Sequence, residues 1–184
     1  MSSNRLALYS QRMAVITLVF IITMMVLNAG VWLFPDVASE YGLGFALTER
    51  QLSSLSAEAM RLTGWQCLGA MLLSSIPLLA LAFGLGHLRQ LFQRYAQGEY
   101  FSSEAAVCLG KVGRAVALWV LLDLLCEPFL SLLVTINAPV GKRLLTLSVT
   151  APSFVALFLA ACIAIIARIL SRASEVDSEN RTFV

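Results

Sequence analysis

Charge is scarce in this sequence. Of its 184 residues, 13 are Lys or Arg and 11 are Asp or Glu, so that only 13% are charged, whereas soluble domains average about 25%. The formal net charge of +2 is also too small to favour direct binding of nucleic acid. The composition therefore argues against an ordinary soluble domain and against a nucleic-acid-binding protein.

Motifs for metal binding and for catalysis are lacking as well. The chain holds one histidine, His87, and four cysteines that lie far apart, at positions 67, 108, 126 and 162. None of these spacings is typical of a zinc site or of a disulfide framework. The sequence also has no Gly-rich phosphate loop and no nucleophile–base pair. We therefore expect no metal, no cofactor and no enzymatic activity.

Long apolar runs are what the sequence has instead. About 20 apolar helical residues cross the hydrocarbon core of a bilayer, which is roughly 30 Å thick. Four windows meet this requirement: residues 13–34, 65–86, 115–136 and 149–170. The first run is longer than the apolar part of a signal peptide, so we expect an uncleaved span. The prediction is an all-α, polytopic membrane protein, in which residues 1–184 form a single membrane domain built on a four-helix bundle.

The distribution of Lys and Arg predicts the orientation of the chain. Nine of them fall at the N-terminus, between the second and third spans, or at the C-terminal end, and four fall in the other two connections. Basic residues accumulate on the cytoplasmic side of membrane proteins. We expect a multi-pass protein of the bacterial cytoplasmic (inner) membrane, with both termini and residues 87–114 inside and residues 35–64 outside. Trp32, Phe34 and Trp65 would then lie at the outer interface, which favours aromatic rings.

The connection between the second and third spans, residues 87–114, predicts a cytoplasmic helical hairpin. Its apolar residues recur with helical spacing on one face, and Gly98 suits the end of a helix. Ser102 or Ser103 can cap the helix that follows. The apolar face must bury against the membrane surface, the chain's own tail (171–184) or a separate protein. The expected partner-docking residues of the hairpin and the C-terminal end are Leu88, Leu91, Phe92, Tyr95, Phe101, Arg168, Glu179 and Asn180.

Two acidic residues lie within the third span. Asp123 and Glu127 are four residues apart and share a helix face. A charge at mid-bilayer costs roughly 2.5–3.5 kcal/mol, so both side chains should face the interior of the bundle. We expect an intramembrane polar site of Asp123, Glu127, Asn28 and Ser131, beside a helix that Pro128 can kink. The site fits either a proton or cation pathway or a hydrogen-bonded cluster that fixes helix register.

The fourth span carries small residues along one face. They are Ser153, Ala156, Ala160, Ala164 and Ala167. Small side chains let a neighbouring helix approach closely, which drives helix packing in lipid. We expect this face to be a packing seam within the bundle or, alternatively, a contact between copies of the chain in a homo-oligomer.

Two stretches resemble a known bacterial family of four-span membrane proteins. The first is LRQLFQRYAQGEYFS, residues 88–102, and the second runs from Ala167-Arg168-Ile169-Leu170 through Ala173 to ENRTFV at residues 179–184. The family is the one catalogued as domain of unknown function 2975, and its members often have Asn where Ala105 stands here. The resemblance implies a four-span fold and a membrane location, but no reaction. It also implies a small helix-turn-helix regulator as a cytoplasmic partner.

Two functions are therefore open at this point. The first is a regulatory or interaction module, whose cytoplasmic hairpin and tail dock a protein partner. The second is a small proton- or cation-coupled transporter or channel subunit that uses Asp123 and Glu127.

Overall fold

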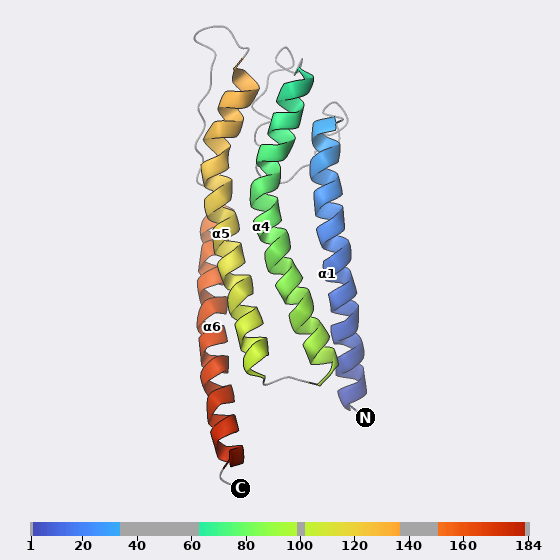
Figure 1. Ribbon diagram of the computed structural model, residues 1–184, viewed down its shortest axis with the longest axis vertical. Helices are drawn as coiled ribbons and strands as arrows, with labels where there is room; N and C mark the ends of the chain where they lie inside the picture. The colour runs from blue at the N-terminus through green and yellow to red at the C-terminus, as the bar shows by residue number, and fades with distance from the viewer. Residues whose placement is uncertain (1, 34–62, 99–101, 137–150, 183–184) are drawn as a thin grey trace. The chain divides into compact units, whose positions relative to one another are not determined.

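The apolar runs of the sequence form long helices, because a chain in hydrocarbon must satisfy its own backbone hydrogen bonds. In the computed structural model they are α1 (Ser2–Leu33), α4 (Gly64–Ala96), α5 (Ser103–Thr135) and α6 (Ala151–Thr182), shown in Figure 1. The structure describes residues 2–33, 63–98, 102–136 and 151–182, and among these the side chains of residues 6–176. The expected all-α class is confirmed.

Each of these helices is longer than a bilayer core requires. They have 32 or 33 residues, which at 1.5 Å per residue gives about 50 Å. Each contains a segment that is long and apolar enough to cross a membrane: Leu6–Leu33, Gly64–Ala96, Ser103–Thr135 and Ala151–Val176. The helices extend past the predicted spans, and α4 continues without a break from residue 86 to Ala96. The extra turns provide helical surface beyond the hydrocarbon.

Large apolar side chains lie on the outside of the helices and polar ones lie inside. The exposed fractions of Phe83, Phe129 and Phe158 are 68%, 62% and 69%, respectively. Asn28 and Glu127, in contrast, are 2% and 1% exposed. Soluble monomers do not expose apolar surface on this scale, whereas lipid tails solvate it. The four apolar helices therefore indicate a multi-pass membrane protein.

The chain divides into two compact units. The first unit contains residues 2–21 of α1, 80–96 of α4, 103–118 of α5 and the whole of α6. The second unit contains residues 22–33 of α1, 64–79 of α4 and 119–135 of α5. Three of the helices thus pass from one unit into the other.

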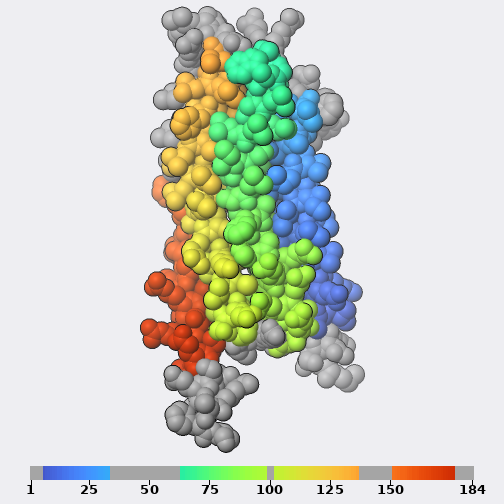
Figure 2. All heavy atoms as spheres, in the orientation of Figure 1, coloured from blue at the N-terminus to red at the C-terminus, as the bar shows by residue number. Residues whose placement is uncertain are grey.

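In the first unit, the end of α4 packs against the beginning of α5. Leu91, Ala105 and Cys108 are buried together at the centre of this contact. Gly84 brings the helices close, since a Cβ atom placed on it would lie 2.6 Å from the Cβ of Ala115. Residues 80–96 and 103–118, green and yellow in Figure 2, lie side by side.

In the second unit, α1, α4 and α5 share an apolar cluster. Its buried members are Trp32, Ala70, Cys126, Leu130 and Val134. Trp32 is only 1% exposed, so its ring faces the protein interior, and its depth in the membrane stays a prediction. Its indole N–H has a buried hydrogen-bond partner in Ser74, which satisfies the polar edge of the buried ring.

Candidate functional site

A hydrogen-bonded cluster joins α1 to α4 inside the second unit. The Trp32 indole N–H donates to Ser74 Oγ at 2.9 Å, and Ser74 Oγ–H donates to Asn28 Oδ1 at 3.1 Å. The Asn28 amide donates to Ser75 Oγ, also at 3.1 Å. Asn28 and Ser74 are both 2% exposed. In a low-dielectric interior such a network holds two helices in one register.

The predicted intramembrane polar residues all lie in this second unit. Glu127 and Ser131 are each 1% exposed, and Asn28 is 2% exposed, whereas Asp123 is half-buried. Glu127 is followed directly by Pro128, inside the continuous helix α5. The structure therefore buries one of the two acids fully and the other only partly.

Gln66, which the sequence analysis did not single out, links two helix ends in the same unit. Its side-chain amide donates to the carbonyl oxygen of Leu133 at 3.1 Å, near the end of α5. Its Oε1 accepts from the backbone N–H of Thr63 at 3.0 Å, immediately before α4. Terminal carbonyls and N–H groups have no partner within their own helices, so one buried side chain satisfies groups at both ends. The signal was Thr63-Gly64-Trp65-Gln66, which has the spacing of a capping box.

The apolar face of the hairpin is buried within the hairpin itself. Leu91 is 3% exposed and contacts Ala105 and Cys108 of α5, and Leu88 and Tyr95 pack around this cluster. Leu91 therefore contacts the second helix of the hairpin itself rather than the membrane, the tail or another protein, and docking by the other predicted residues stays a prediction. The reason for the Leu91 contact is steric: Ala105 and Cys108 of α5 occupy the space over these apolar side chains of α4.

The turn that separates α4 from α5 has well-defined ends. Gly98, the residue expected to end the helix, has φ of 88°, in the region that favours glycine. Ser102 Oγ accepts from the backbone N–H of Ala105 at 3.1 Å, so it caps α5 as expected. Arg94 and Glu104 form an ion pair across the turn. The hairpin is thus fixed by a cap, an ion pair and an apolar cluster.

The predicted small-residue face of α6 meets two glycines of α5 in the first unit. A Cβ placed on Gly113 would lie 3.0 Å from the carbonyl oxygen of Ala160 and 3.4 Å from the backbone nitrogen of Ala164. One placed on Gly110 would lie 3.6 Å from the Cβ of Ala167. Ser153 and Ala156 are half-buried. The sequence analysis missed the glycines, although a spacing of three residues places both on one face of the helix.

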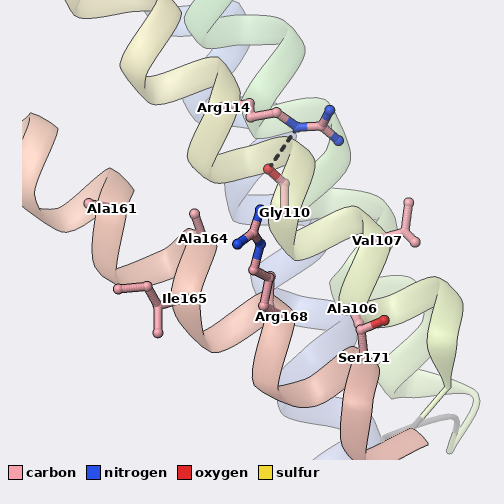
Figure 3. A pocket seen from close by; sticks show the side chains of 10 residues that line it. Ala106, Val107, Gly110, Arg114, Ala161, Ala164, Ile165, Arg168 and Ser171 are labelled. Carbon is pink, nitrogen blue, oxygen red and sulfur yellow. Dashed lines mark hydrogen bonds between the residues drawn. The ribbon is translucent and has the colours of Figure 1, made fainter. Parts of the chain in front are cut away.

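An open groove runs beside this seam, between α5 and α6 (Figure 3). Its volume is about 570 Å³. Small residues of both helices form much of its wall, and Arg114 and Arg168 border it. The Nε of Arg114 donates to the Gly110 carbonyl oxygen at 3.4 Å. Arg168, which we expected to contact a docked protein, is therefore part of a groove in the described structure.

The whole-chain comparison now identifies the family. A family model described as "Protein of unknown function (DUF2975)" matches residues 13–184. The chain belongs to this family. The match includes both stretches on which the resemblance was based, residues 88–102 and 167–184, so the resemblance is confirmed. Comparisons with curated proteins and with solved structures give no match.

Of the remaining predicted site residues of this DUF2975 protein, the structure describes the side chain of Phe92 only. Phe92 is half-buried, in α4. Phe101 lies outside the described residues, and Glu179 and Asn180 lie in α6 with side chains that the structure does not describe. Within the described ranges, no three His, Cys, Asp or Glu side chains come together as metal ligands. The described part of this DUF2975 chain instead brings together a hydrogen-bonded cluster, two apolar clusters and a groove bordered by two arginines.

Proposed function

We propose that this protein is a non-enzymatic interaction module of the bacterial inner membrane. Its hairpin, residues 87–114, and its tail, residues 171–184, dock a cytoplasmic protein. The Lys and Arg distribution, nine residues against four, supports placing both termini and the hairpin in the cytoplasm. The family resemblance favours a small helix-turn-helix regulator as the partner.

One observation carries the proposal: the two helices of the hairpin are joined to each other and expose polar side chains. The apolar cluster around Leu91 and the Arg94–Glu104 ion pair hold its two helices together. Gln90, Gln93 and Lys111 are exposed on it. A preorganised surface loses little conformational entropy when it binds. A face of amides and charges suits a water-soluble partner rather than lipid.

Orientation is tested with reporter fusions. A fluorescent reporter that folds only in the cytoplasm, placed after residue 98 or after residue 184, should fluoresce in both fusions. A periplasm-dependent phosphatase at the same positions should be inactive. Active phosphatase at either position would contradict the proposed topology.

Docking is tested by cross-linking in native membranes, followed by purification of the tagged full-length protein. Phe92→Ala should reduce recovery of the cross-linked partner, because an aromatic side chain at an interface contributes strongly to binding. The matched control is Phe83→Ala in the same helix, whose ring is 68% exposed within the apolar span. Equal partner recovery from the two variants would contradict a docking surface on the hairpin.

A second function is favoured by the burial of Glu127, which is 1% exposed inside α5. A carboxyl group at that depth is costly and could carry protons or cations across the membrane, with Asp123 beside it. The test is flux into vesicles that contain the purified protein. Transport should be lost in Glu127→Gln and kept in Glu104→Gln, whose carboxylate is exposed on the hairpin. Vesicles without flux would count against this alternative.

A further inference from the structure

We propose that the groove between α5 and α6 binds the headgroup of an anionic phospholipid. The groove lies in the first unit, beside the seam that Gly110 and Gly113 form with α6. The inference concerns lipid rather than protein, and it holds whether or not a partner docks on the hairpin.

The groove is positive and of suitable size. Arg114 and Arg168 both border it, and of the described residues that line it none is acidic. Its volume of about 570 Å³ falls in the range of small-ligand pockets, about 300–1,000 Å³. In the described part of the chain Arg168 forms no ion pair, and Arg114 bonds only to a backbone carbonyl. Two guanidinium groups without carboxylate partners favour an anion.

Helix direction makes the two arginine side chains lean toward one another along the seam. Gly110 faces Ala167 and Gly113 faces Ala160, so these parts of α5 and α6 are antiparallel. Side chains of a helix lean toward its N-terminus, and here the two N-termini point in opposite directions. Arg114 accordingly reaches back to the Gly110 carbonyl, and Arg168 extends from α6 toward Gly110 (Figure 3). Two guanidinium groups that border one groove suit the oxygens of a phosphodiester.

The depth and the surroundings favour lipid as the source of the phosphate. Arg114 directly precedes the third apolar span and Arg168 lies in the last turn of the fourth, so both belong at one membrane boundary. Ile165, which also lines the groove, is 60% exposed. It continues the lipid-facing surface of α6 on the membrane side of Arg168 and can contact an acyl chain. Anionic lipids concentrate in the cytoplasmic leaflet, where basic residues attract them.

The test uses native mass spectrometry of the full-length protein in detergent, delipidated and titrated with phosphatidylglycerol or with phosphatidylcholine of the same acyl chains. Phosphatidylglycerol should bind more tightly. Arg114→Ala and Arg168→Ala should each weaken it about fivefold, since a basic residue contributes about 1 kcal/mol near an anionic surface. Arg172→Ala is the matched control, exposed on the same helix but outside the groove, and it should change the affinity less than twofold.

Three outcomes would overturn the proposal. Equal affinity for the two lipids would show that the groove does not distinguish an anionic headgroup from a zwitterionic one. Equal loss in Arg172→Ala and Arg168→Ala would show a diffuse electrostatic effect. Displacement of the lipid by inorganic phosphate that binds with the same dependence on Arg114 and Arg168 would show a site for free anions. Arg168→Lys separates charge from shape: it keeps the charge but loses the planar fork, and we expect an intermediate loss of affinity.

Discussion

The indole nitrogen of Trp32 lies 2.9 Å from the hydroxyl oxygen of Ser74, and this hydrogen bond joins α1 to α4 in the interior of the second unit. Ser74 also donates to Asn28 of α1. Because Trp32 and Ser74 are buried, water cannot replace either group when its partner is removed. The pair therefore determines how these two helix segments are aligned.

Replacing Ser74 with Ala should lower the free energy of unfolding by about 1–3 kcal/mol, because the buried indole N–H loses its acceptor. In a double-mutant cycle with Trp32→Phe, the coupling energy should be about 0.6–2 kcal/mol. Unfolding of the purified protein in detergent micelles measures both quantities. Trp65→Phe is the control, since that ring is 50% exposed. Strictly additive effects of Ser74→Ala and Trp32→Phe would contradict the coupling.

Two glycines of α4 should respond in opposite ways to the same substitution. Gly84→Ala places a Cβ 2.6 Å from that of Ala115, so the helices must separate, at a cost of about 1–3 kcal/mol. Gly86→Ala meets no atom within 4 Å and should be neutral, or stabilising by up to about 1 kcal/mol through helix propensity. The measurement is the midpoint of thermal unfolding of each variant in the same detergent micelles. Equal midpoints would show that Gly84 is not a close-contact site.

Leu91→Ala should destabilise the protein by about 2–5 kcal/mol, since it leaves a cavity against Ala105 and Cys108. The matched control is Leu118→Ala, whose side chain is 51% exposed on α5 and leaves no cavity. Hydrogen exchange at the ends of α4 and α5 should report faster opening in Leu91→Ala alone. Similar exchange in both variants would show that the cluster does not hold the hairpin together.

Gln66→Leu should cost about 1–3 kcal/mol, because it exchanges hydrogen bonds at two helix ends for a side chain of similar size that cannot form them. Gln93→Leu, an exposed position of the same helix, is the control. Chemical denaturation in micelles gives both values. If the control loses as much stability as Gln66→Leu, the buried amide has no special role.

The helices and local caps could be predicted from the sequence because their causes are local. An apolar run of membrane length predicts a span whatever surrounds it, and Gly98 and Ser102 act through their own backbone neighbourhoods. The face of small residues on α6 could also be predicted, since helical spacing alone places Ala160, Ala164 and Ala167 on one side of the helix.

The partners of these faces could not be predicted, because partner choice is a three-dimensional outcome. The spacing of Leu88, Leu91 and Tyr95 showed that a face must be buried, but not that Ala105 and Cys108 of α5 cover it. The type and position of Trp32 predicted a membrane depth but not which side chains surround the ring. Its indole N–H bonds to Ser74, 42 residues away, which no local pattern reveals.

The hydrogen bond from Gln66 to Leu133 has a consequence for biogenesis. Its two residues are 67 positions apart, and ribosomes add about 5–20 residues per second. The nascent N-terminal end of α4 therefore emerges at least about 3 s before the carbonyls that it will bind. Until α5 has been made, that amide has no Leu133 carbonyl to bind, so α4 can form this contact only after synthesis of the third span.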